Sequence, residues 1–474
     1  MLTALLLSLL VQGAAPLQSG STGAQAAPRS DSLTGHVDAD ASTFAANDPL
    51  QLGMTASQPS VHTSVSVLSP PPIGYQFGLR PRVLQVLLTS TATGFEEPLL
   101  LQVPVKNAPL QPMLVAFHKF GANEDDVWNN TKLPLECAKR NWFLLSSLGA
   151  SKKSFASVES QLNREEALAW VLKHYSRRID RTRIYGAGFS MGGGSLLSYA
   201  ARHQAQDDVR FAALVNHTGT VSLEHAWVNE VQEIHDVMVF WFGGSPFAKP
   251  FEFQRSSVLS FASSALTPVP DQSMCTNLTH VPMLVLNAAQ DPIDYLVTQT
   301  QIFFAYMNSL GAQVDYLQLP GDEHAWDTID AADLCDFLSS YTLQPLPLAG
   351  KLLADRSGGW FWFDIDQDVP GSFTPVEWEF IPDWNLVSIL NTRNLSRLSL
   401  DVAASPLDVT KGVSVQVSAA DFVADVVELR GYTQPPSQVL RDSKPTNAWS
   451  YDPVEGKVTL FESDTQLHAW RVMP

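Results

Sequence analysis

Short apolar runs alternate with longer amphipathic stretches from about residue 75 to about residue 345, and this alternation constrains the possible fold most strongly. The run MLVAF (Met113–Phe117) is continuously apolar, as expected of a parallel strand covered on both faces. The stretch 157–180 places its apolar residues broadly on one helical face and its charges on the others. Strands that alternate with helices predict an α/β domain, with helices on both faces of a mostly parallel sheet.

The remaining elements of residues 75–345 follow from the same patterns. Further strands are expected at 82–91, 97–105, 141–149, 183–188, 211–217, 281–289 and 313–321, and further helices at 193–203, 294–311 and 330–341. About sixty residues, 219–278, fall outside the alternation and include the aromatic run VMVFWFGGSPF. We predict that they form an insertion that caps the carboxyl edge of the sheet.

The chain changes character after about residue 345. Six short alternating runs separated by turn residues occupy 358–366, 374–380, 395–403, 412–419, 425–432 and 457–463. This pattern predicts an all-β module over residues 346–474. Trp360, Trp362, Trp378 and Trp384 belong to it, and they either stack on a polymer surface or form the core of a sandwich.

The N-terminal segment has the pattern of an export signal. The apolar run Leu2–Val11 is too short to span a bilayer, and Ala24-Gln25-Ala26 fits a small-x-small cleavage site. We therefore expect a signal peptide at 1–26 and a secreted or periplasmic protein. Residues 27–74 are rich in Ser, Ala, Thr, Gly and Pro, which predicts a linker or disordered arm.

Composition excludes several partners. The chain has 45% hydrophobic residues, which is typical of a globular protein, and 48 acidic against 30 basic residues give a formal charge of −18. Such an acidic surface disfavours nucleic acids and anionic membranes, and no later stretch predicts stable membrane insertion. Cys137, Cys275 and Cys335 show no metal-binding spacing, so we expect no metal.

The stretch RIYGAGFSMGGG (Arg183–Gly194) concentrates glycines around one serine. A phosphate-binding loop requires a lysine that is missing here, and a dinucleotide fingerprint requires a third glycine where Met191 stands. The segment Gly188–Gly192 instead reads Gly-x-Ser-x-Gly, the pattern of a tight strand-to-helix turn that presents a nucleophile. Ser190 is therefore the predicted nucleophile.

A serine nucleophile needs a base, and the base needs an orienting carboxylate. Asp291 follows the predicted strand 281–289, and His324 follows the predicted strand 313–321. Ser190, Asp291 and His324 thus occur in the order expected for this kind of sheet, each on a loop after a strand. Asp294 is an alternative acid that more simply begins the next helix, and His217 either lines the site or is buried.

The oxyanion of the reaction needs two backbone donors. We predict the N–H of Met191, directly after the nucleophile, and the N–H of Phe120, with Lys119 as an alternative. The candidate substrate contacts are His118, Lys119, Trp241 and Trp326, and further aromatic residues of the insertion either line an acyl pocket or form the core of the cap.

Residues 75–345 resemble the α/β-hydrolase superfamily, and within it the secreted polyhydroxyalkanoate-depolymerase, feruloyl/acetyl-esterase and prolyl-oligopeptidase-like branch. The stretches IDRTRIYGAGFSMGGG, LVLNAAQDPID and GDEHAW carry the likeness. The resemblance implies an eight-stranded, mostly parallel sheet, a Ser190-Asp291-His324 triad and no cofactor. The oxyanion loop of this family usually reads His-Gly-x-x, and Lys119 stands in place of that glycine.

The sequence therefore predicts a secreted serine hydrolase that cleaves carboxylic esters, polymeric esters included, through an acyl-enzyme. One alternative is a serine peptidase of the prolyl-oligopeptidase type, although no propeller repeat precedes residue 75. Another is a polymer-binding protein that has a hydrolase fold.

Overall fold

The computed structural model describes residues 63–67, 81–106, 108–262, 265–419, 426–462 and 466–474. The predicted signal peptide (1–26) and most of the predicted arm (27–74) lie outside the described residues. Within the arm, strand β1 (Thr63–Val67) pairs antiparallel with β2 (Arg82–Thr89). Residues 63–67 of the predicted arm thus form a strand, where the alternating TSVSV extends the sheet at its edge.

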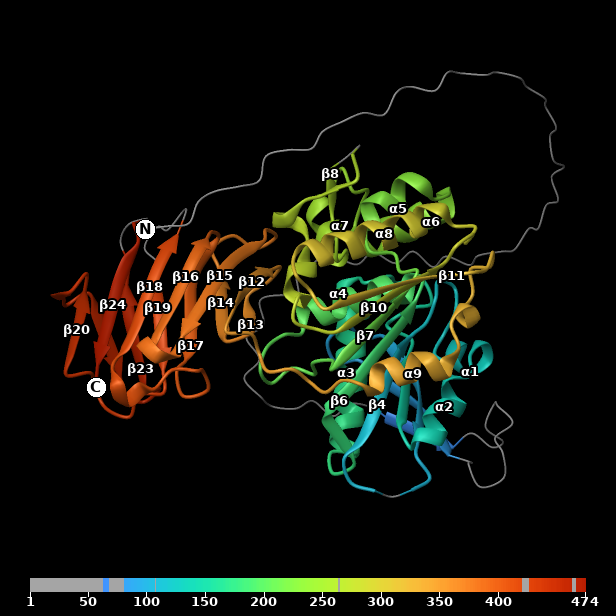
Figure 1. The fold of residues 1–474 in the computed structure, drawn as a ribbon, viewed down its shortest axis with the longest axis horizontal. Helices are drawn as coiled ribbons and strands as arrows, with labels where there is room; N and C mark the ends of the chain where they lie inside the picture. The colour runs from blue at the N-terminus through green and yellow to red at the C-terminus, as the bar shows by residue number, and fades with distance from the viewer. Residues whose placement is uncertain (1–62, 68–80, 107, 263–264, 420–425, 463–465) are drawn as a thin grey trace, which may run out of the picture. The chain divides into compact units, whose positions relative to one another are not determined.

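A nine-stranded sheet forms the centre of the described α/β part (Figure 1). Its other strands are β3 (Glu96–Val103), β4 (Gln111–Phe117), β5 (Phe143–Ser147), β6 (Ile179–Phe189), β7 (Ala213–His217), β10 (Met283–Ala288) and β11 (Val314–Leu319). The strand order is β1-β2-β3-β5-β4-β6-β7-β10-β11. The first three pairings are antiparallel, and all pairings from β5 to β11 are parallel. The resemblance implied eight strands, and β1 is the additional one.

Helices pack on both faces of this sheet. They are α1 (Asp126–Asn130), α2 (Leu133–Arg140), α3 (Val158–His174), α4 (Met191–Arg202), α8 (Asp294–Ser309) and α9 (Ala331–Ser339). Strand β4 shows why: Met113 and Val115 join the apolar cluster that includes residues of α3, α4 and α8. Leu114 and Ala116 join the cluster that includes residues of α1, α2 and α9. Because strand side chains alternate between faces, an all-apolar strand needs cover on both.

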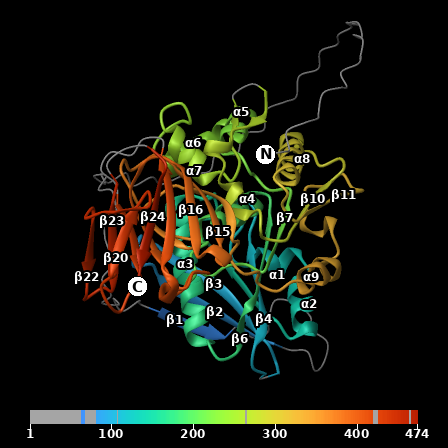
Figure 2. The same cartoon turned by 60° about the vertical axis from the view of Figure 1, so that its left-hand side comes forward.

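The segment 219–278 contains α5 (Leu223–Asn229), α6 (Gln232–Phe242), α7 (Pro250–Ser256), the short strands β8 (Phe261–Ala262) and β9 (Thr267–Pro268), and two short 3₁₀ helices, η2 (Pro270–Gln272) and η3 (Met274–Leu278). Figures 1 and 2 both show α5, α6 and α7 gathered at one end of the sheet. Buried residues of these helices form an apolar cluster together with Phe155 and Met191. Since Met191 begins the helix after β6, this cluster covers the carboxyl end of that strand.

Two sheets form the C-terminal all-β part. One has the order β12-β15-β16-β18-β24-β20-β21, and the other β13-β14-β17-β19-β23-β22. The strands are β12 (Ala349–Ala354), β13 (Gly358–Trp360), β14 (Phe363–Gln367), β15 (Thr374–Ile381), β16 (Leu386–Thr392), β17 (Leu395–Asp401), β18 (Val413–Ala419), β19 (Val426–Arg430), β20 (Gln438–Arg441), β21 (Lys444–Pro445), β22 (Trp449–Asp452), β23 (Lys457–Phe461) and β24 (His468–Met473). An α/β part followed by an all-β part is thereby confirmed.

The tryptophans of the all-β part divide between the core and the surface. Trp360 and Trp378 are 0% and 3% exposed, so they pack inside the sandwich and offer no stacking surface. Trp384 is 70% exposed. Trp362 is half-buried, and its indole N–H donates to the carbonyl of Pro347 at 2.9 Å.

Buried polar side chains join the two parts. Asp355, between β12 and β13, accepts hydrogen bonds from Arg202 at the end of α4 and from Arg255 in α7. Asn277 in η3 donates to the carbonyls of Ala201 and Leu353 at 3.0 and 3.1 Å and accepts from the N–H of Leu353 at 2.8 Å. Both Asp355 and Asn277 are almost inaccessible to solvent, at 2% and 0% exposure. One carboxylate therefore connects the helix after Ser190, the insertion and the all-β part.

Candidate active site

Ser190 lies on the turn between β6 and α4, as the Gly-x-Ser-x-Gly pattern predicts. Its backbone has φ 56° and ψ −124°, a region that non-glycine residues rarely adopt, and its side chain is mostly buried. The N–H of Ser190 donates to the carbonyl of His217 at 2.9 Å. Such strain persists only where the surrounding structure imposes it, and it is common at catalytic residues.

The flanking glycines allow the close packing of this turn. A Cβ atom on Gly188 would meet the carbonyl oxygen of Gly192 at 2.3 Å. A Cβ on Gly192 would meet the carbonyl oxygens of Phe117 and His118 at 2.1 and 2.5 Å. The glycines therefore hold the start of α4 against the end of β4, which brings the loop after β4 beside the serine.

Asp291 and His324 form a hydrogen-bonded pair. Asp291 follows β10 and is 2% exposed, and its Oδ2 lies 2.7 Å from Nδ1 of His324, in the loop after β11. The other carboxylate oxygen accepts the N–H of Ile293 at 2.9 Å. With the Nδ1 proton directed at Asp291, Nε2 of the neutral ring presents its lone pair. Nε2 is buried and has no hydrogen-bond partner among the described residues.

Phe189 connects this pair to the Ser190 turn. Its ring centroid lies 4.5 Å from that of His324, and Ser190 is the next residue. The sheet therefore brings the Ser190 turn and the Asp291–His324 pair to the carboxyl ends of the parallel strands β6, β10 and β11, with β7 between β6 and β10. Asp294, the alternative acid, is exposed at the first residue of α8.

His217 is buried beside these residues. It is 1% exposed, and its ring lies 4.6 Å from Phe189. Burial, and then the nearby His324, lower the pKa of His217 to about 3. The ring is therefore neutral at physiological pH, and it packs beneath the site instead of lining it.

The predicted oxyanion donors lie on the two segments that Gly192 brings together. In the described part of the chain, the N–H groups of Met191 and Phe120 donate to no protein acceptor. The N–H of Lys119, the alternative donor, is directed 3.3 Å away to Oδ2 of Asp126. Phe120 is anchored by its ring, which packs against Phe155 with centroids 5.5 Å apart.

Two of the residues predicted to contact the substrate are buried. His118 is 0% exposed, and its two ring nitrogens lie 2.9 and 2.7 Å from the carbonyl oxygens of Lys119 and Leu148. Trp326 is 4% exposed and donates its indole N–H to Asp126 at 2.8 Å. Both side chains turn inward and hold the loops in place, so neither has the surface that a substrate contact requires.

The aromatic residues of the insertion occupy several environments. Phe242 is 4% exposed and belongs to the apolar cluster around Met191. Trp241 is half-buried against this cluster and meets Phe95 edge-on at 6.1 Å. Phe240 and Phe247 are 72% and 85% exposed. The cluster and Trp241 therefore supply an apolar wall beside the start of α4.

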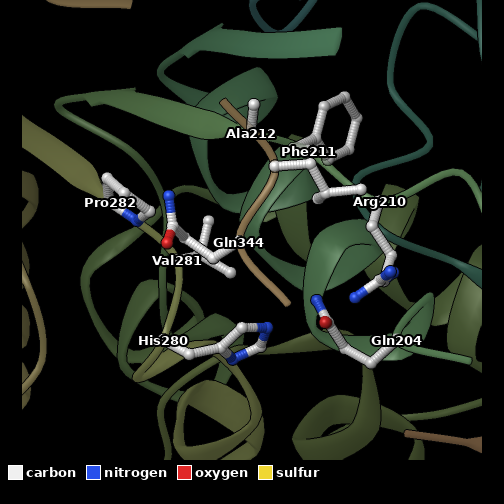
Figure 3. Close-up of a pocket in the computed structure, with 9 residues that line it drawn as sticks. Gln204, Arg210, Phe211, Ala212, His280, Val281, Pro282 and Gln344 are labelled. Atoms are coloured by element: carbon white, nitrogen blue, oxygen red, sulfur yellow. The ribbon is translucent and has the colours of Figure 1, made fainter. Parts of the chain in front are cut away.

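A separate pocket lies at the opposite edge of the sheet (Figure 3). Its lining includes Phe211 and Ala212 just before β7, and Val281 and Pro282 just before β10. Figure 3 shows the polar ends of Gln204 and Arg210 facing each other in it. Parallel α/β sheets bind substrates at the carboxyl ends of their strands, so this pocket is not the candidate active site.

The described residues contain no group of three or more His, Cys, Asp or Glu side chains arranged to hold a metal ion. Cys137, Cys275 and Cys335 are buried free thiols. In the same described part, no helix combines the length and the apolar character needed to cross a bilayer.

Three solved structures similar to this chain are hydrolases. A ferulic acid esterase is 17% identical over 54% of this chain and 96% of its own, with a TM-score of 0.40. The S-formylglutathione hydrolase of Staphylococcus aureus is 14% identical over 58% and 98%, with a TM-score of 0.40. An acetyl xylan esterase from Paenibacillus sp. R4 is 14% identical over 60% and 90%, with a TM-score of 0.42. No protein-family model and no curated protein matches the chain.

Proposed function

We propose that this chain is a serine hydrolase that cleaves carboxylic esters through an acyl-enzyme. The observation that carries the proposal is the strained Ser190 turn, which adjoins a partly buried His324 that is hydrogen-bonded to Asp291. A histidine oriented by a carboxylate, with its second nitrogen unused, is the base that a serine nucleophile requires.

In the proposed reaction, Ser190 Oγ attacks the ester carbonyl carbon while its proton passes to His324 Nε2. The N–H groups of Met191 and Phe120 stabilise the resulting oxyanion, each by about 2.7–4 kcal/mol. The tetrahedral intermediate collapses, and the imidazolium protonates the departing alcohol. Water then gives a proton to His324 as it attacks the acyl-enzyme, and the imidazolium returns that proton to Ser190 Oγ as the acid leaves.

The surroundings favour an apolar acyl group. Phe120, Trp227 and Trp241 are partly exposed apolar side chains that pack against the buried cluster around Met191, at the start of α4. We propose that segment 219–278 serves as a cap and that Trp241 forms part of the acyl wall, while Lys119 lies at its rim. We also propose that a signal peptide at 1–26 directs export of the protein and that the protein acts on polymeric esters.

The experiment measures p-nitrophenyl acetate and butyrate hydrolysis by the full chain and by Ser190→Ala. We expect Ser190→Ala to reduce kcat by about 10⁴-fold or more. Ser195→Ala is the matched control, because Ser195 is a buried serine of α4, the helix that follows Ser190, and its hydroxyl has no partner among the described residues. Equal turnover by Ser190→Ala and Ser195→Ala would refute the proposal.

A further inference from the structure

A buried carboxylate outside the triad contacts two loops of the site. Asp126 is the first residue of α1 and is 2% exposed. Its Oδ2 accepts the backbone N–H of Lys119 at 3.3 Å and the indole N–H of Trp326 at 2.8 Å. Its Oδ1 accepts a hydrogen bond from Asn130 at 2.7 Å.

The two partners of Oδ2 come from distant parts of the sequence. Lys119 directly precedes Phe120, the predicted second oxyanion donor, in the loop after β4. Trp326 lies two residues after His324 and 200 residues after Asp126. One oxygen atom therefore joins the oxyanion loop to the base loop across the carboxyl edge of the sheet.

We infer that Asp126 is a positioning residue, which sets the oxyanion donor and the general base relative to each other. The inference rests on the proposed function, and no reacting atom touches Asp126 itself. Burying a carboxylate is costly unless hydrogen bonds compensate it, and charge-assisted bonds are short and directional. Such a bridge restricts both loops more tightly than apolar packing would.

The contacts also account for the lysine in the oxyanion loop. The N–H of Lys119 points to Asp126, so the loop uses this donor for its own support. Within the described residues, the next N–H, that of Phe120, has no protein acceptor. Asp126 thereby selects which backbone donor of the loop can serve the oxyanion.

A purely structural role would also explain a buried aspartate at a helix start, so the test must separate the two roles. Asp126→Asn retains the shape but removes the charge and half of the accepting capacity. Trp326→Phe removes the indole N–H together with part of the buried ring, and so breaks the hydrogen bond between Asp126 and the base loop. Asn130→Ala is the matched control, because Asn130 is exposed and contacts the same carboxylate through its other oxygen.

Two measurements on the full chain are combined. Steady-state hydrolysis of p-nitrophenyl butyrate is measured well below the unfolding temperature and gives kcat and KM. Hydrogen exchange read by mass spectrometry follows peptides that cover residues 117–122 and 322–328.

We expect Asp126→Asn to lower kcat about 10- to 100-fold with KM changed less than about twofold, since misplacement by about 1 Å is enough for such a loss. In this variant, hydrogen exchange should become faster in both of the peptides, 117–122 and 322–328. Trp326→Phe should lower kcat by a smaller factor, and adding it to Asp126→Asn should have little further effect. Asn130→Ala should retain kcat within about twofold.

Two results would overturn the inference. One is an Asp126→Asn variant that loses stability yet retains a kcat within about twofold of the Asn130→Ala control. The other is exchange that rises in only one of the two peptides. Turnover that persists in Ser190→Ala would refute the proposed function alone, and the exchange data would still decide whether Asp126 couples the loops.

Discussion

Gly192→Ala should disable the site through a single methyl group. The added Cβ would lie 2.1 Å from the carbonyl oxygen of Phe117 and 2.5 Å from that of His118. Both are backbone atoms, so no side chain can rotate away to relieve the contact. An ordinary carbon–oxygen contact is about 3.3–3.6 Å, so the first turn of α4 and the end of β4 must separate by roughly 1 Å.

This displacement acts on Ser190 and on the oxyanion donors at the same time. A shift of about 1 Å costs about 100-fold in rate, and overpacking of this kind costs about 1–3 kcal/mol of stability. We therefore expect kcat/KM for p-nitrophenyl butyrate to fall about 100-fold or more, while the chain remains folded at 25 °C.

Gly311→Ala is the control for the loss of stability. Gly311 has φ 74° at the end of α8, and nothing lies within 4 Å of the position that an added methyl group would take. The substitution should cost about 1–2 kcal/mol through backbone strain alone and leave kcat/KM unchanged. Urea unfolding and ester hydrolysis would be measured for both variants. Wild-type turnover by Gly192→Ala would show that the serine turn does not depend on close packing against β4.

Three further predictions concern stability. Burial lowers the pKa of His217 to about 3 in the folded chain, so below about pH 6.5 this histidine binds a proton only in the unfolded chain. The free energy of unfolding should therefore fall by about 1.4 kcal/mol per pH unit between pH 6.5 and pH 3. The urea midpoint should fall less steeply over this range for His217→Asn. The arginine partners of Asp355 hold its carboxyl pKa well below its usual range, so its contribution to stability is complete above about pH 4 and is lost as pH falls further. Asp355→Asn should lower the free energy of unfolding at pH 7 by about 3–5 kcal/mol, and its stability should fall less below pH 4 than that of the wild type. Trp360→Ala should lower the free energy of unfolding by about 3–5 kcal/mol, and Trp384→Ala should lower it by less than about 0.5 kcal/mol. Thermal unfolding measures both, and equal losses would contradict the division of these tryptophans between core and surface.

The sequence predicted the parts of the site that follow directly from local pattern. The all-apolar run Met113–Phe117 favoured a strand covered on both faces, and the glycines around Ser190 favoured a crowded turn because both nucleotide-binding patterns fail there. Asp291 and His324 each follow a strongly patterned strand, so their meeting at one sheet edge followed from the parallel order.

Other features depend on contacts that local pattern does not contain. Trp326 stands near His324 in sequence, but its indole N–H is drawn inward by Asp126, which sequence reasoning did not select. A lone aspartate at the start of a short helix carries no signal until the sheet brings Lys119 and Trp326 together. Strand β1 was missed because its serines and threonine resemble the composition of the preceding arm.

The role of Asn277 has a consequence for producing this protein. Asn277-Leu278-Thr279 is an acceptor sequence for N-linked glycans, which are attached during synthesis in eukaryotic secretory pathways. The amide of Asn277 is inaccessible in the folded chain, and its hydrogen bonds hold η3 to α4 and β12. A glycan there would prevent the all-β part from docking, so a bacterial host should yield folded protein where a glycosylating host yields a destabilised fraction.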